Sequence, residues 1–323
     1  MFETMSEIEE YFPLLPFEKE LIEYVRSIYP HDQLDYMVQS PFAQVVVADR
    51  QLAIVIRNIY EDNSSKTENA YQLYKFNYFD FNMLSFWSSE WDEKKDICKK
   101  MIANKLGVST QPRIFARKTT FDPAVSLKEA KEFCNLYHIQ GYAASNVRTG
   151  LRDSNNQLVA LCLFKITKGV ADLVRYCTSQ EVVGGFSKVE KHSYPLLKEL
   201  NVHQVKTFAD LAVSQGKLYE DTGWTKDKDL DPDYKYQVGD HLEHKFNYRL
   251  KRFREDPNLL YKEGMTEREL ALWNQIPRVY DYGKIKYVKA LWPQENQPPY
   301  IPIFPRILSR TPLQGRALER WLT

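Results

Sequence analysis

Apolar residues in the first third of the chain follow first a helical and then a strand spacing. One helix face is marked by residues three and four positions apart: Phe17, Leu21, Val25 and Ile28. Two β-branched runs, 44–47 and 52–56, then predict a hairpin. We also expect a helix over 68–78, a short buried strand over 83–87 and a helix over 91–106.

The middle of the chain predicts a second alternation of strands and helices. Two apolar runs, 158–166 and 170–177, are joined by a short segment that contains Gly169, which favours an antiparallel hairpin over a single helix. Two glycines at 184 and 185 then begin a helix that runs to residue 200. The other expected elements are strands at 115–120 and 204–209, a helix that Ser126 caps and a short helix from residue 217.

The last part of the chain has a different pattern. Basic and aromatic residues alternate over 245–254, and a helix there would gather several of the basic side chains on one face. A small hairpin is expected at 277–280 and 285–288. Prolines recur within 291–323, and such a segment forms neither a regular helix nor a central strand, so we expect an extended tail.

The charge of the chain is balanced overall but not along its length. With 44 basic and 43 acidic residues, the protein has no uniformly basic coat for nucleic acid. The first forty residues, however, hold nine acidic and two basic side chains, whereas 241–290 holds eleven basic and seven acidic ones. A basic end of this kind predicts binding to a polyanion.

Other compositional features exclude several classes of protein. The four cysteines lie far apart with no C-x-x-C pair, so a zinc or redox motif is unsupported and we expect buried thiols. The acidic start lacks the charge and apolar run of a secretory signal, and no apolar stretch approaches the length that spans a bilayer. We therefore expect a soluble protein of a reducing compartment, without a membrane partner.

Five blocks in the second half of the chain carry a resemblance to a known family. They are RYCTSQEVVGGFSKV (175–189), VKTFADLAVSQGKLYEDTGW (205–224), PDYKY (232–236), GMTERE (264–269) and RVYDYGKIKY (278–287). In this order they resemble the phage homing-endonuclease-like proteins, whose N-terminal part has the PD-(D/E)xK-like fold of very-short-patch repair endonucleases. The resemblance covers about residues 1–290 and implies a protein of the host cytoplasm or the virion.

The resemblance implies an α/β (α+β) fold in four parts. These are an endonuclease-like domain at 1–112, a middle domain at 113–240, a basic DNA-contacting region at 241–290 and the Pro-rich tail at 291–323. The order strand, Gly-Gly, helix, strand, LYEDTGW makes the middle domain similar to the GNAT class of acetyltransferases.

The nuclease centre that the resemblance implies is matched only in part. Glu20 matches the family's first acidic position, Lys75 resembles its helix lysine, and Asp62 falls near its histidine. Gln44 and Val55 stand where two carboxylates belong, and neither side chain offers the charged oxygen that a hard cation requires. We expect a vestigial centre with no metal and no cofactor, and Mg²⁺ only if the nuclease is active.

A different register of the same segment leaves catalysis open. In it, Asp49, Glu61 and Asp62 would supply the metal ligands from a hairpin tip. The spacing of these residues does not require this arrangement, and it stays an alternative.

An anion site is a candidate at the start of the helix that follows residue 183. In the GNAT fold, backbone N–H groups at this helix start hold a pyrophosphate. Gly184, Gly185 and Ser187 are the candidate residues here, but the loop lacks a basic residue and the fuller glycine spacing of a coenzyme A site. A tight strand-to-helix turn, or a site for a DNA phosphate, are the other interpretations.

The basic segment gives the DNA-contacting candidates. They are Lys245, Arg249, Lys251, Arg252, Arg254, Lys284 and Lys286. The alternative is an amphipathic surface helix with a solvated charged face. We expect His138 to be structural, and His241 and His244, three residues apart, to belong to the basic stretch rather than to a metal site.

Three functions follow from these observations. The first is a phage-type protein that binds double-stranded DNA, derived from a homing endonuclease with an inactive centre. The second is an active, metal-dependent, site-specific DNA endonuclease. The third is a structural or inhibitory protein that docks on a host or phage protein through the tail 291–323 and its aromatic faces, with Trp292 among the anchors.

Overall fold

The computed structural model describes residues 14–29, 34–39, 42–60, 81–108 and 112–292. This part of the chain is mixed α/β, as predicted, and belongs to two compact units that are each built from three segments. Unit 1 comprises Met1–Val108, Ala209–Gln215 and Asp229–Ile285; unit 2 comprises Ser109–Phe208, Gly216–Lys228 and Lys286–Thr323. The predicted basic region 241–290 is therefore divided between the two units after Ile285.

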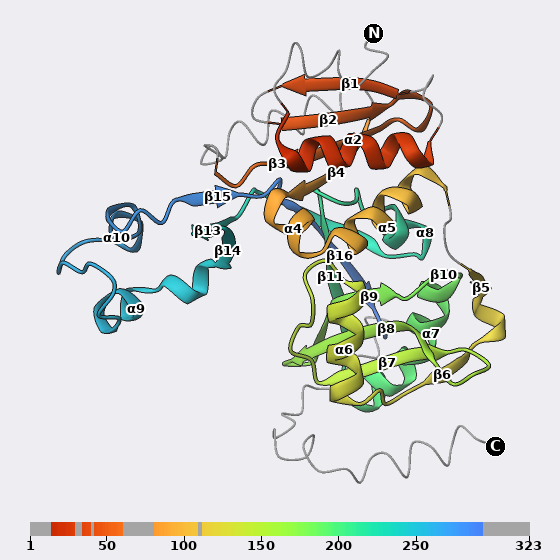
Figure 1. The fold of residues 1–323 in the computed structure, drawn as a ribbon. Helices are drawn as coiled ribbons and strands as arrows, with labels where there is room; N and C mark the ends of the chain where they lie inside the picture. Colours follow the sequence, from red (N-terminus) through yellow and green to blue (C-terminus); the bar gives the residue numbers. More distant parts are fainter. Residues whose placement is uncertain (1–13, 30–33, 40–41, 61–80, 109–111, 293–323) are drawn as a thin grey trace. The chain divides into compact units, whose positions relative to one another are not determined.

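Unit 1 contains a four-stranded sheet of order β1-β2-β3-β4 (Figure 1). Its strands are β1 (Leu34–Gln39), β2 (Phe42–Val47), β3 (Leu52–Arg57) and β4 (Asn82–Trp87). β2 and β3 pair antiparallel, which confirms the predicted hairpin, and β4 lies parallel to β3. All six residues of β3 are buried, which explains its unbroken apolar sequence.

Three helices of unit 1 accompany this sheet. They are α2 (Pro16–Ile28), α4 (Ser88–Glu93) and α5 (Lys95–Leu106). α2 buries the predicted apolar face and starts with proline at its first position, where a missing N–H costs nothing. The prediction of one helix over 91–106 is wrong, because the backbone leaves the helical conformation at Lys94. The predicted helix over 68–78 lies outside the described residues.

A three-stranded sheet of order β14-β13-β15 forms a second part of unit 1. Its elements are β13 (Tyr234–Val238), β14 (His241–His244), η4 (Lys245–Tyr248), α9 (Leu250–Glu255), α10 (Glu267–Trp273) and β15 (Arg278–Tyr280). The segment 245–254, which could gather its basic side chains on one face if it were helical throughout, is not one helix: Arg249 is extended and separates the 3-10 turn η4 from α9. The predicted hairpin at 277–288 is also wrong, because β15 pairs with β13.

A seven-stranded sheet of order β12-β16-β11-β9-β8-β7-β6 forms most of unit 2. Its strands are β6 (Thr120–Asp122), β7 (Val147–Arg152), β8 (Leu158–Thr167), β9 (Val170–Thr178), β11 (Gln204–Asp210), β12 (Thr225–Leu230) and β16 (Lys284–Ala290). β8 and β9 are the predicted antiparallel hairpin. β9 and β11 are parallel, so the chain must cross over between them, and α7 (Gly185–Glu199) makes this crossing.

Two helices cover opposite faces of this sheet. α6 (Leu127–Tyr137) packs with Leu161 and Leu163 of β8 in one apolar cluster. Ser193 of α7 instead bonds to Thr149, which lies opposite Cys162 in the register of β7 and β8. Because neighbouring strand residues point to opposite faces, α6 and α7 lie on different sides of the sheet. Ser126 caps α6 as predicted.

Shorter elements complete the described chain. α8 (Lys217–Asp221) follows β11, and β5 (Arg113–Phe115) and β10 (Glu181–Val183) form a parallel pair next to the 3-10 turn η3 (Ala116–Lys118). The predicted strand over 115–120 is therefore interrupted by η3. Among the described residues, no helix combines the length and the apolar character that a bilayer crossing requires.

Candidate functional site

The predicted nuclease residue Glu20 lies on α2 and is engaged by neighbours in unit 1. Its carboxylate pairs with the ammonium of Lys95 and accepts a hydrogen bond of 3.1 Å from the indole Nε1 of Trp91. The hydrogen bonds from Lys95 and then Trp91 lower the pKa of Glu20. This carboxylate is therefore charged and held by protein donors.

Of the two strand positions of the predicted centre, Val55 lies in apolar surroundings. Gln44 and Val55 are paired in the register of β2 and β3. Val55 is fully buried and packs with Met83 and Tyr282. Asp62 and Lys75, like Glu61 of the alternative register, lie outside the described residues. Within the ranges that the structure describes, no group of three His, Cys, Asp or Glu residues is placed to hold a metal.

Gly184 and Gly185, the candidate anion residues, form a tight entry to α7. Gly184 is the N-cap with a φ of +73°, a conformation that favours glycine. A Cβ on Gly185 would lie 2.8 Å from Val182 and 3.1 Å from the hydroxyl of Tyr176, so this position also requires glycine for packing. Ser187 lies one turn into the helix.

The same helix end is linked to the segment that follows β5. Lys188 donates from Nζ to the carbonyl of Ala116 at 2.9 Å and to that of Thr119. Gly184 lies beside the Ala116 methyl group, where an added Cβ would stand at 3.8 Å. The basic side chain of this first turn is therefore used to hold a neighbouring segment.

The two parallel strands next to α7 separate along their length. Their backbone pairing is confined to Val170–Asp172 with Gln204–Lys206. Beyond that point the hydroxyl of Thr207 donates to the carbonyl of Leu173 at 3.1 Å. A cluster of rings lies beside the opened strands, formed by Tyr176, Phe186, Tyr219, Trp224 and Tyr287. Burial raises the pKa of Tyr219, so its phenol stays protonated.

The basic–aromatic segment 244–256 divides its aromatic side chains between core and surface. Tyr248 and Phe253 are buried in the apolar core of the small sheet. The Phe246 residue is 62% exposed. Its backbone N–H donates to Nδ1 of His244 at 3.2 Å. The Phe246 ring lies 4.9 Å from the His244 ring and 4.6 Å from the guanidinium carbon of Arg249. The Phe246 side chain is therefore exposed on the surface, in contact with the His244 ring and the Arg249 guanidinium.

Three of the predicted DNA-contacting cations are held in short ion pairs. Lys245 pairs with Asp233 at 2.6 Å and Lys284 with Asp281 at 2.5 Å, both in unit 1. In unit 2, Lys286 pairs with Asp227 at 2.7 Å. Their side chains are 24–31% exposed.

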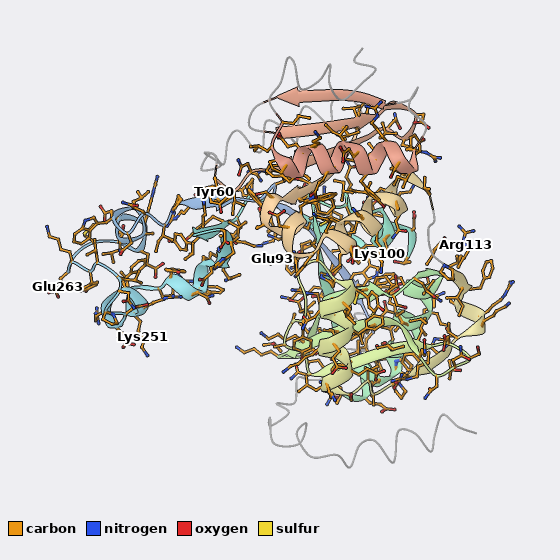
Figure 2. All side chains as sticks on the ribbon, in the orientation of Figure 1. Tyr60, Glu93, Lys100, Arg113, Lys251 and Glu263 are labelled. Carbon is orange, nitrogen blue, oxygen red and sulfur yellow. The ribbon has the colours of Figure 1, made fainter. Side chains whose placement is uncertain are left out.

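The four arginine and lysine residues of the 249–254 stretch have longer contacts. Arg249 lies 3.2 Å from Glu267, Lys251 3.9 Å from Glu255, and Arg252 3.6 Å from Glu243. Arg254 donates to the hydroxyl of Tyr261 at 3.5 Å. The Lys251 side chain is 80% exposed and extends from α9 (Figure 2). The structure therefore brings three of the seven candidates, Arg249, Lys251 and Arg252, to one surface hollow.

A shallow hollow of about 550 Å³ lies on this surface. It is lined by Phe246, Asn247, Arg249, Lys251, Arg252, Glu255 and Asp256. Cations, carboxylates and an exposed ring therefore share one depression. Neither the carboxylates nor the depression was predicted from the sequence, because both depend on the turn at Arg249.

The candidate histidines have local roles. Nδ1 of His138 accepts from the backbone N–H of Gln140 at 3.1 Å, next to the end of α6. His241 and His244 lie at the two ends of the strand β14. Nδ1 of His241 lies 2.7 Å from Asp240.

A buried polar cluster in unit 2 was not predicted. Glu190 of α7 is 1% exposed, and its Oε1 accepts from Trp224 Nε1 at 2.6 Å, from Lys289 Nζ at 3.0 Å and from the Tyr194 hydroxyl. Lys289 also donates to the carbonyl of Thr222 at 2.7 Å. Lys289 therefore serves the interior of unit 2. Nothing in the local sequence signals a pair separated by ninety-nine positions.

Trp292, a predicted anchor for a protein partner, is bound within unit 2. Its indole Nε1 donates to the carbonyl of Val202 at 3.1 Å, and Lys198 lies over the ring at 4.9 Å. The remaining residues of the predicted tail, 293–323, lie outside the described residues.

Comparison with known proteins gives only distant structural similarity. The chain matches no protein-family model and no curated protein. It is similar to the ribosomal-protein-S18-alanine N-acetyltransferase from Escherichia coli, at 12% identity, with 55% of this chain and 97% of that chain covered and a TM-score of 0.33. For a Bacillus subtilis acetyltransferase in complex with CoA the identity is 9%, with 54% of this chain and 100% of that chain covered and a TM-score of 0.33. For a spermidine/spermine N-acetyltransferase from Vibrio cholerae the identity is 11%, with 55% of this chain and 94% of that chain covered and a TM-score of 0.33.

These similarities concern about half of the chain. At such identities and TM-scores they assign neither an activity nor a ligand to this protein.

Proposed function

We propose that the protein binds DNA through the surface formed by η4 and α9. The observation that carries this proposal is the hollow beside Phe246, where Arg249, Lys251 and Arg252 lie around one exposed ring. Guanidinium and ammonium groups bind phosphate oxygens, and an exposed ring offers a face to a base. The nuclease centre takes no part in this proposal.

The ion pairs of this surface do not prevent phosphate binding. An exposed pair contributes only about 0–1 kcal/mol, because water screens it and two flexible side chains must be held. Lys251 is 80% exposed with its carboxylate at 3.9 Å, and Arg249 is 49% exposed. A phosphate can therefore replace these carboxylates at small cost. Lys245, Lys284 and Lys286, in shorter and less exposed pairs, are less available, so the proposal narrows to Arg249, Lys251, Arg252 and Arg254.

Fluorescence anisotropy of labelled DNA at increasing salt tests the proposal. If four phosphates are contacted, the logarithm of the binding constant for duplex falls with the logarithm of salt with a slope of about −3.6, because counterions are released. Lys251→Glu combined with Arg252→Glu should weaken binding and reduce the slope by about 1.8.

Lys228→Glu is the matched control, since Lys228 is an exposed cation of β12 in unit 2. It should leave the affinity and the slope unchanged. The proposal would be rejected if the affinity for DNA did not depend on the salt concentration. It would also be rejected if a folded Lys251→Glu, Arg252→Glu variant bound DNA as tightly as the unchanged protein.

A second candidate function is binding of a coenzyme A thioester by unit 2. The separation of β9 from β11 favours it, since the backbone pairing of these two strands ends at Asp172 and Lys206 and leaves the following backbone groups without a partner strand. The use of Lys188 to hold Ala116 and Thr119 argues against it. Calorimetric titration with acetyl-coenzyme A is the test. Saturable binding that Gly185→Val abolishes in a folded variant would support this function over a DNA phosphate site at the start of α7.

A further inference from the structure

We infer that the hollow beside Phe246 binds one unstacked base of a single-stranded DNA segment. This inference rests on the proposed DNA binding and names the form of DNA that the surface takes. It is argued from three features of the same depression: the exposed ring, the mixture of charges and the size.

The Phe246 ring is exposed but not loosely held. The backbone N–H of Phe246 is bonded to His244, and its ring is flanked by the His244 ring and the Arg249 guanidinium. A side chain fixed in this way loses little conformational freedom when a ligand stacks on it. Exposed aromatic faces next to arginine are the means by which proteins bind bases of single strands, since every base has a π-face.

The charges of the hollow distinguish a base from a duplex backbone. Glu255 and Asp256 line the hollow together with Arg249, Lys251 and Arg252. On a surface that met only the phosphates of a duplex, these carboxylates would serve only as ion-pair partners of Lys251 and Arg252. Carboxylates accept hydrogen bonds from the exocyclic amino groups of bases, while the cations bind the adjoining phosphates. The mixed lining therefore fits a whole nucleotide.

The size of the hollow also fits a single nucleotide. Its volume of about 550 Å³ lies within the range of about 300–1,000 Å³ that holds small ligands in proteins. A single nucleotide can enter such a space. The bases of an intact duplex are stacked inside the helix and cannot reach the Phe246 ring.

The test compares the full chain on a mixed-sequence strand of about 12 nucleotides with its duplex, by anisotropy at one salt concentration. We expect the single strand to bind more tightly than the duplex. Phe246→Ala should weaken single-strand binding roughly 5- to 150-fold and leave duplex binding nearly unchanged, because one stacking contact is lost. Phe246→Trp should restore the preference, and quenching by the strand beyond that of the unchanged chain, which has six tryptophans of its own, reports the stacking.

Leu272→Ala is the matched control, since Leu272 is 59% exposed in the same unit but does not line the hollow. It should change neither affinity, and thermal unfolding confirms that each variant is folded. Equal or tighter duplex binding that Phe246→Ala leaves unaltered would overturn the inference while the proposed function stands. Failure to bind either form of DNA in a salt-dependent way would overturn the proposed function itself.

Discussion

At residue 216 the backbone has a φ of +86°, and the ring of Tyr287 occupies the space that a side chain would need. A Cβ there would lie 2.4–2.6 Å from three atoms of that ring. Tyr287 is fully buried, and its hydroxyl donates to Glu220 at 2.8 Å. The ring therefore cannot move aside without losing this hydrogen bond and its packing. Gly216 is therefore required both by the conformation of the backbone and by packing.

Gly216→Ala should destabilise unit 2 by about 2–5 kcal/mol, the sum of backbone strain and overpacking. Gly223→Ala is the matched control, because Gly223 also has a positive φ, of +79°, but an added Cβ would meet nothing within 4 Å. It should cost only about 1 kcal/mol. Urea unfolding measures both, and equal losses would contradict the role given to Tyr287.

The ion pair between Glu129 and Arg152 makes a prediction about acid stability. Arg152 donates to both carboxylate oxygens of Glu129, at 2.9 and 2.7 Å. The hydrogen bonds from Arg152 lower the pKa of Glu129 from its usual 4.5. Because the folded pKa lies below the unfolded one, this stabilisation is complete above pH 4.5 and is lost as the pH falls below it.

Glu129→Gln should therefore make the decline of thermal stability below pH 4.5 shallower. At neutral pH we expect a loss of about 0.5–1 kcal/mol, since the carboxylate is partly exposed and screened by water. Glu132→Gln, an exposed position on the same helix, controls for the loss of a surface charge. If the thermal stability of the Glu129→Gln variant fell as steeply below pH 4.5 as that of the unchanged protein, the role given to the Glu129–Arg152 pair in acid stability would be contradicted.

At the scale of elements, α7 is tied to the end of β16 by the buried pair Glu190–Lys289. Glu190 is almost completely buried, whereas Lys289 is 21% exposed. Lys289→Met should cost about 3–5 kcal/mol, because it leaves a carboxylate in the interior without its cation. Adding Glu190→Gln should recover part of this loss, since the charge that needed a partner is then gone. A double-mutant cycle in urea measures the coupling, and additive losses would show that the pair contributes nothing.

Elements with strong local signals were predictable from the sequence. The hairpins β2–β3 and β8–β9 consist of apolar runs with short connections, and Ser126 caps α6 as expected. The basic segment 245–254 was not predictable, because its helical periodicity continues through Arg249. Burial of Tyr248 and Phe253 in the core of the small sheet overrides that periodicity and breaks the segment.

Long-range pairings explain why the candidate site was only partly predicted. The sequence identified the cations of 249–254 but also Lys284 and Lys286, which the structure holds in short ion pairs. The partner of Lys284 is only three positions away, whereas Asp227, the partner of Lys286, lies far away in the chain, where no local pattern connects the two residues. The resemblance to an endonuclease rests partly on residues outside the described ranges, so it stays a prediction.

At the scale of the whole molecule, each unit depends on segments that the chain supplies late. β16 lies between β11 and β12 in the large sheet, although it follows both in the sequence. A chain that ends at residue 283 lacks this strand, and we expect it to lose the cooperative unfolding of unit 2. A chain that ends at residue 292 keeps β16 and serves as the control. Retention of cooperative thermal unfolding by the shorter chain would contradict the role of β16.

The late position of β16 also has a consequence during synthesis. Between the end of β12 and the start of β16, the ribosome must add 53 residues, 231–283. At about 5–20 residues per second, this takes roughly 3–11 s, so β11 and β12 are made seconds before the strand that joins them. A nascent chain that has released β12 before β16 has open strand edges, and β12, with its run Lys226-Asp227-Lys228-Asp229, carries charges of the kind that discourage two such edges from associating.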